Sequence, residues 1–78
     1  MNYYTVVYVP TGNSYDPIPN ALIKQLKSND IRLVAESARS SSIIVQMKED
    51  ETFLLENLLE VLRVEQNIHI PNNLYTNH

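Results

Sequence analysis

Two short runs of β-branched, aromatic and aliphatic side chains most constrain the fold of this chain. The first is residues 3–9 (Tyr-Tyr-Thr-Val-Val-Tyr-Val) and the second is residues 43–47 (Ile-Ile-Val-Gln-Met). Such residues favour extended backbone, and Pro10 and Gly12 end the first run with turn formers. Because apolar residues occupy both odd and even positions, each run is typical of a strand buried on both faces. These two strands are therefore predicted to be central in a sheet.

The segment between the two runs predicts a helix, an extended segment and a hairpin connection. Asp16 as N-cap and Pro17 in the first helical position indicate where the helix begins, and it is expected to end near Ser28 and Asn29. Residues 31–36 alternate apolar and polar side chains, which predicts a half-buried strand. The polar stretch 37–42 is typical of a hairpin connection.

After the second run, leucines at helical spacing predict a second helix from Asp50 or Thr52 to about Arg63. Residues 66–71 alternate polar and apolar side chains, and Pro71 is tolerated on an edge strand. A fourth strand is therefore predicted at the edge of the sheet.

The order β-α-β-β-α-β predicts an α+β fold of the ferredoxin-like type. It implies a four-stranded antiparallel sheet in the order 4-1-3-2, with both helices on one face. The two apolar runs would then be the central strands, as their composition requires. A chain of 78 residues has enough apolar side chains for one core only, so residues 1–78 are expected to form a single domain, with 72–78 as a disordered tail.

Composition and charge exclude several classes of function. The sequence contains no cysteine, which removes disulfides and thiol nucleophiles and fits a cytoplasmic protein. No run approaches the roughly 18 apolar residues that span a bilayer, so no membrane partner is expected. The net charge of −3 divides into +2 for residues 1–48 and −5 for residues 49–78. This distribution offers no basic track for phosphates, so nucleic acid is not an expected partner.

Two helices cover only one face of such a sheet, which leaves apolar side chains of the central strands on the other face. In one register the uncovered set is Tyr4, Val6 and Tyr8, joined by Ile44, and Val34 and His69 complete this predicted interface. In the opposite register Thr5, Val7 and Val9 are uncovered instead. An exposed apolar patch usually marks an interface. Homodimerisation through the sheet face is favoured over a foreign partner.

The sequence predicts no catalytic, metal or cofactor site. His69 has no carboxylate at a ligand spacing, the serines at 40–42 have no partner base, and Glu56 and Glu60 lie on a polar helix face. The loop before the first helix offers a candidate ligand site instead. There Asn13, Ser14 and Asp16 lie beside a predicted helix N-terminus, whose free N–H groups can bind small anions or carboxylates, although the N-cap role alone also explains Asp16 and its charge would repel an anion.

Four segments between residues 21 and 62 form a further pattern: Ala-Leu-Ile-Lys-Gln-Leu (21–26), Asn-Asp-Ile-Arg-Leu-Val (29–34), Ser-Ser-Ile-Ile-Val (41–45) and the second predicted helix. In this order they resemble the helix, strand, serine-led strand and helix of an ACT regulatory domain. That family has Asp, two residues and Gly before its first helix, whereas Asp16 is followed here by Pro-Ile-Pro-Asn. The resemblance implies a small-molecule sensor formed at a subunit interface.

Two functions from different classes fit these observations. The first is a non-enzymatic regulatory domain that self-associates through its sheet face and senses a small ligand. The second is a small inhibitor or adaptor of the kind encoded by phages and mobile elements, which binds and blocks a host protein. An enzyme ranks third, because no nucleophile, base and orienting residue form a set.

Overall fold

The computed structural model describes residues 1–67 and contains four strands and two α-helices. The strands are β1 (Asn2–Tyr8), β2 (Arg32–Ser37), β3 (Ser42–Met47) and β4 (Val61–Gln66). The helices are α1 (Asn20–Ser28) and α2 (Phe53–Glu56), and a 3-10 turn, η1 (Glu49–Glu51), precedes α2. The α+β class predicted from the sequence is confirmed.

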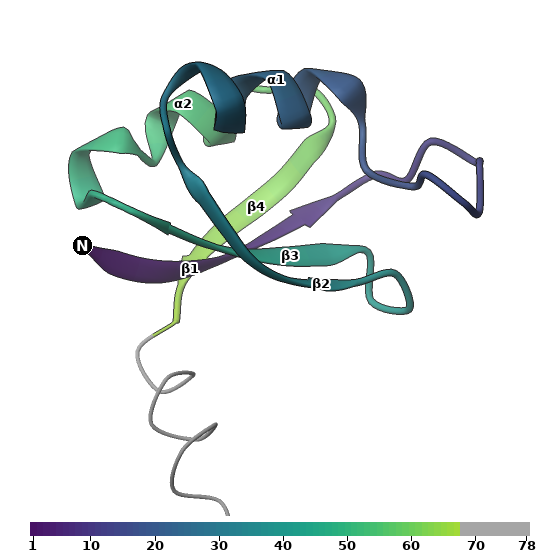
Figure 1. The fold of residues 1–78 in the computed structure, drawn as a ribbon, viewed down its shortest axis with the longest axis horizontal. Helices are drawn as coiled ribbons and strands as arrows, with labels where there is room; N and C mark the ends of the chain where they lie inside the picture. The colour runs from purple at the N-terminus through teal and green to yellow at the C-terminus, as the bar shows by residue number, and fades with distance from the viewer. Residues whose placement is uncertain (68–78) are drawn as a thin grey trace, which may run out of the picture.

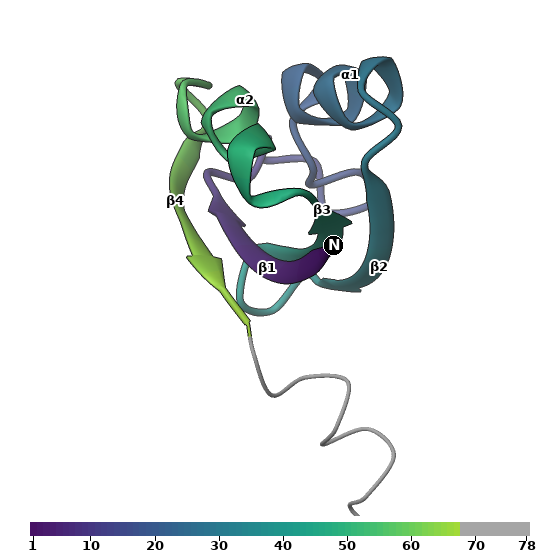
Figure 2. The same ribbon diagram turned by 90° about the vertical axis from the view of Figure 1, so that its left-hand side faces the viewer.

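The strands form one open antiparallel sheet in the order β2-β3-β1-β4, with β1 and β3 in the centre (Figure 1). Thr5 lies opposite Ile44, and Val6 lies opposite Ile43. In both views α1 and α2 lie on the same side of the sheet (Figure 2). The predicted bounds of the first three strands are correct to within a residue or two.

The core lies between this side of the sheet and the helices. β1 and β3 supply it with alternate residues, because successive side chains of a strand point to opposite faces. The buried hydrophobic side chains are Tyr4, Val6, Tyr8, Ile18, Leu22, Leu26, Ile31, Ile43, Val45, Met47, Leu55 and Val61. The strands β1, β3 and β4 and both helices contribute to this cluster, whereas β2 and η1 do not.

The first helix begins three residues later than the sequence predicts. Its first residue is Asn20, and Pro19 is the N-cap with extended backbone (φ −58°, ψ 140°). A proline disfavours helical backbone in the residue before it, so Ile18 cannot join a helix that also contains Pro19. Asp16 is therefore not an N-cap. The end of α1 at Ser28 agrees with the prediction, and Asp30, two residues later, has left-handed backbone (φ 54°).

The predicted second helix is wrong over most of its length. α2 ends at Glu56, and residues 61–66 form β4, which pairs with β1. The predicted fourth strand, 66–71, overlaps β4 only at Gln66, and its residues 68–71 lie outside the described residues, as does the predicted tail 72–78. Residues 61–66 form a strand rather than a helix because pairing with β1 gives them a ladder of backbone hydrogen bonds and buries Val61.

Both edge strands are irregular. The pairing of β2 with β3 shifts between Leu33 and Ala35, which leaves Val34 as an extra residue. The pairing of β1 with β4 shifts between Val7 and Tyr8, which leaves Leu62 as an extra residue. Such bulges bend an edge strand and hinder the addition of another strand to it.

Candidate functional site

Three residues of the predicted interface are core residues. Tyr4, Val6 and Tyr8 are 4%, 0% and 1% exposed and face the helices. Because directly opposite residues in a sheet share a face, Val6 shares its face with Ile43 and not with Ile44. The prediction that these three side chains form an exposed surface is therefore wrong. The structure adopts the opposite register, in which Thr5, Val7 and Val9 are the outward set.

We call the side of the sheet that faces away from the helices the open face. The pairing registers assign eleven residues to it: Tyr3, Thr5, Val7, Arg32, Ala35, Ser37, Ser42, Ile44, Gln46, Arg63 and Glu65. Val7 and Ile44 are half-buried near its centre. Ile44 therefore keeps its predicted place on the uncovered side of the sheet.

Further apolar side chains are exposed at the end of β1 and in the bulges of the edge strands. Val9 directly follows β1, and its N–H donates to the carbonyl of Glu60 at 2.8 Å. It is 47% exposed, and Leu62 in the β4 bulge is 62% exposed. Val34, in the β2 bulge, is also exposed, and its place in an interface stays a prediction. His69, the last residue of the predicted interface, lies outside the described residues.

Polar contacts occur on two sides of the open face, because Ser37 and Ser42 bond the Ser40 hydroxyl beside the β2–β3 turn and the remaining contacts lie on the β4 side. The side-chain amide of Asn67 donates to the Thr5 hydroxyl at 2.7 Å, and its backbone N–H donates to the carbonyl of Tyr3. Arg63 and Glu65 form an exposed ion pair. Exposed pairs of this kind contribute little stability. Val7 and Ile44 are the aliphatic residues of the open face on the two central strands, where they lie opposite Ser42 and Thr5.

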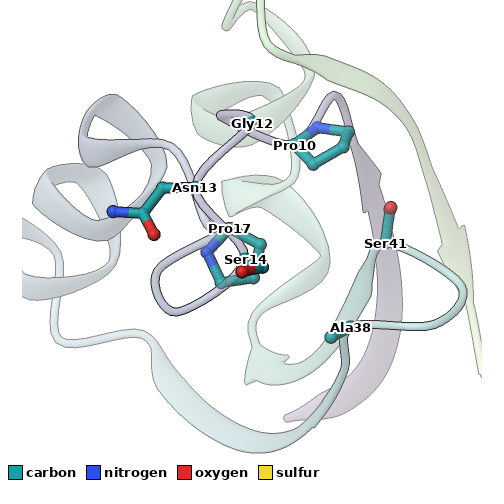
Figure 3. Close-up of a pocket in the computed structure, with 7 residues that line it drawn as sticks. All are labelled: Pro10, Gly12, Asn13, Ser14, Pro17, Ala38 and Ser41. Carbon is teal, nitrogen blue, oxygen red and sulfur yellow. The ribbon is translucent and has the colours of Figure 1, made fainter.

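A second candidate site lies at the end of the sheet where the β1–α1 loop meets the β2–β3 turn (Figure 1). We call it the loop pocket, and its volume is about 260 Å³. Its lining residues are Pro10, Gly12, Asn13, Ser14 and Pro17 from the loop and Ala38 and Ser41 from the turn (Figure 3).

The β1–α1 loop is held by its own hydrogen bonds. The Thr11 N–H donates to the Pro17 carbonyl at 3.0 Å, and the Thr11 hydroxyl donates to the Asp16 carbonyl at 2.8 Å. The Asn13 side chain accepts from the N–H of Tyr15, as in an Asx turn. Gly12 has φ 93°, a conformation that other residues rarely adopt. This loop therefore has a defined conformation although it contains no regular element.

The opposite wall of the pocket is tied to the sheet. The N–H of Tyr8 donates to the carbonyl of Ser41 at 3.0 Å, and the N–H of Ser41 donates to the carbonyl of Ala38. The hydroxyl of Ser40 bonds those of Ser37 and Ser42 at 2.8 Å each. Ser41 has a positive φ of 51°. These contacts fix the turn in place.

The pocket includes two of the three residues predicted to bind a ligand. Asn13 and Ser14 line it, although Figure 3 shows the Asn13 amide directed away from Ala38 and Ser41. Asp16 is exposed and does not line it. Since α1 begins at Asn20, its free N–H groups are not beside Asp16, so the predicted helix-terminus site is wrong in its geometry.

Titratable residues in the described part of the chain are dispersed. No group of three or more His, Asp or Glu side chains in residues 1–67 is placed to hold a metal ion.

Burial, with the negative charge of Glu36 as a smaller cause, raises the pKa of the Tyr8 phenol above 10.0. No helix within residues 1–67 has the length and apolar character needed to cross a membrane.

The far wall of the loop pocket could not be predicted from local patterns, because Ala38 and Ser41 lie more than 20 residues after Pro17, the last lining residue of the β1–α1 loop. Only the order of strands brings the two loops together.

No family model, curated protein or solved structure matches this chain. The open face and the loop pocket are therefore the features that bear on function.

Proposed function

We propose that this chain is a non-catalytic binding domain of the ferredoxin-like type, which self-associates through its open face to form a homodimer. One observation carries the proposal. Val7 and Ile44 lie on the two central strands of a sheet face that neither helix covers, and Val9 after β1 and the bulge residues Val34 and Leu62 are exposed. An apolar surface framed by polar residues is typical of a protein interface.

The size of this surface indicates how tight the dimer is. Four strands about 4.8 Å apart and six residues long give a footprint of roughly 20 Å by 20 Å, at the low end for specific interfaces. Burying the remaining exposed part of five apolar side chains contributes about 1 kcal/mol each, or about 10 kcal/mol for two copies. Association costs a comparable amount in lost translational and rotational freedom and in side-chain ordering. We therefore expect a weak dimer with a micromolar or higher dissociation constant.

The edge strands favour this face over edge-to-edge pairing. β2 and β4 each contain a bulge, at Val34 and at Leu62. A bulge interrupts the regular row of N–H and C=O groups that a second strand would need. A second copy therefore gains more from packing on the face than from extending the sheet.

Sedimentation velocity from low-micromolar to millimolar concentration tests the proposal. Wild type should shift from monomer to dimer, whereas Val7→Glu should stay monomeric because dimerisation would bury its charge. Asn20→Glu changes the net charge equally at an exposed position on α1 and should behave as wild type. Val9→Glu serves as a second variant with less risk to folding, because Val9 lies outside the strand. Unchanged association in both folded variants would refute the proposal.

Exposed residues around α2 favour a second candidate, the protein-binding inhibitor or adaptor. Leu59 is 94% exposed and Phe53 is also exposed, in a segment that contains Glu49, Asp50, Glu51, Glu56 and Glu60. A basic, partly apolar partner would complement such a surface. Binding of a stoichiometric partner that Leu59→Lys abolishes and Val7→Glu preserves would support this function over self-association. The small-ligand sensor suggested by the ACT resemblance remains a prediction.

A further inference from the structure

The loop pocket has a chemical character that the open face lacks. All seven residues that line it are uncharged. Three of them, Pro10, Pro17 and Ala38, present rings or a methyl group, and Ser14 and Ser41 each carry a hydroxyl. We propose that the loop pocket binds a small uncharged molecule with an apolar ring or chain and one hydroxyl or amide group. This inference goes beyond self-association and does not depend on it.

The volume of the pocket limits the size of the ligand. At about 260 Å³ it lies just below the range of roughly 300–1,000 Å³ that is typical of sites for drug-sized molecules. A single ring with a short polar substituent fits this space. The proline rings then contact the apolar part, and the hydroxyls of Ser14 and Ser41 are available to donate to or accept from the polar group.

The uncharged lining selects against ions. A carboxylate or an ammonium group in the pocket gains no opposite charge among the lining residues, whereas an apolar ring gains contact with the prolines. Two charged residues directly adjoin lining residues in the sequence, Asp16 before Pro17 and Arg39 after Ala38. One charge of each sign attracts neither anions nor cations on balance. A free amino acid, which carries both charges, is thus a poor ligand for this site.

The hydrogen bonds of both walls reduce the cost of binding. The Thr11 side chain and backbone close the loop, and the bond from Tyr8 to Ser41 holds the turn against β1. A ligand that enters a site already in place does not have to order its walls. Affinity is then set by contact with the prolines and by the hydroxyls.

Three molecules of similar shape and different charge test the inference. Benzyl alcohol, benzoate and benzylamine are titrated into ¹⁵N-labelled protein at neutral pH, and the amide signals of Gly12, Ser14, Ala38 and Ser41 are followed. Benzyl alcohol should give saturable shifts at these four residues, and both charged analogues should bind at least about 10-fold more weakly. Equal or tighter binding of an ion, or saturable shifts confined to the open face, would overturn the proposal, as would no saturable shift.

Variants separate this site from the dimer interface. Ala38→Leu fills the pocket and should weaken benzyl alcohol at least about 10-fold, whereas Asn20→Glu should bind it as wild type does. Ser14→Ala, which leaves an exposed loop position otherwise intact, should weaken binding a few-fold if Ala38→Leu fails to fold. Val7→Glu should retain full binding even where it abolishes self-association. Wild-type affinity in both pocket variants would refute the site, whatever the oligomeric state.

Discussion

Replacing Val6 and Val7 with alanine, one at a time, distinguishes the two faces of β1. The two residues are adjacent, have the same side chain and lie on a central strand, so differences in β propensity cancel. Val6 is fully buried among the helix-facing residues, whereas Val7 is half-buried on the open face. Only their packing environments differ.

The expected magnitudes follow from this difference. Val6→Ala removes two buried carbon groups worth about 0.8 kcal/mol each and leaves a cavity, for a total loss of about 2–3 kcal/mol. Val7→Ala loses part of the transfer free energy without an enclosed cavity, which amounts to about 0.5–1 kcal/mol. A domain of this size typically has only about 3–5 kcal/mol of stability, so Val6→Ala should be close to unfolding at 37 °C.

Urea unfolding followed by circular dichroism measures both changes, at a protein concentration low enough to keep the chain monomeric. With a slope of about 1 kcal/mol/M, Val6→Ala should lower the midpoint by about 2 M or more and Val7→Ala by less than about 1 M. A larger loss for Val7→Ala than for Val6→Ala would mean that the faces of β1 are reversed, and the open face as defined here would be wrong.

Three further predictions concern single side chains. Because the pKa of Tyr8 is raised in the folded state, the phenol ionises at a lower pH in the unfolded chain, so the free energy of unfolding should fall as pH rises above about 10. Urea unfolding at about pH 8 and about pH 11 measures this fall, and Tyr8→Phe should reduce it. The buried Tyr4 hydroxyl has no hydrogen-bond partner among the described residues, so Tyr4→Phe should stabilise by about 0.5–1 kcal/mol, and a loss of 1 kcal/mol or more in the same assay would contradict this. Asp30 has a left-handed backbone with φ 54°, which glycine adopts readily and valine does not. In thermal unfolding, Asp30→Gly should therefore be within about 0.5 kcal/mol of wild type or more stable, and Asp30→Val should be less stable by about 1–2 kcal/mol. Equal stability of the two variants would oppose this.

The strands that the sequence predicted best are those with unambiguous local patterns. In β3, Ile43, Val45 and Met47 are all apolar, whereas the alternate set contains Ser42 and Gln46 beside Ile44, so the core side of this strand follows from the sequence. β1 has no such contrast, because its two alternating sets are both apolar. The larger set, which contains two tyrosines, is the one that the helices cover. Total side-chain volume was therefore the signal that could have identified the register.

The C-terminal half was predicted less well because its leucines fit two patterns. Leu54, Leu55, Leu58 and Leu62 match a helical face, yet Leu62 is exposed on β4. The β-branched Val61 and Val64 favour a strand, and β1 offers that strand a partner. Local helix propensity is weak, and tertiary pairing readily overrides it.

The loop pocket is harder still to predict from the sequence, because its prediction requires the positions of two loops at once.

Intermolecular contacts at the open face are the central claim, and an isotope-filtered nuclear Overhauser experiment tests them directly. In a millimolar mixture of ¹³C-labelled and unlabelled chains, the methyl groups of Val7 and Ile44 should show contacts to open-face protons of the other copy, while those of buried Val6 and Val45 should show none. Contacts located instead around Leu59 and Phe53, or no intermolecular contacts at all at this concentration, would contradict self-association through the open face.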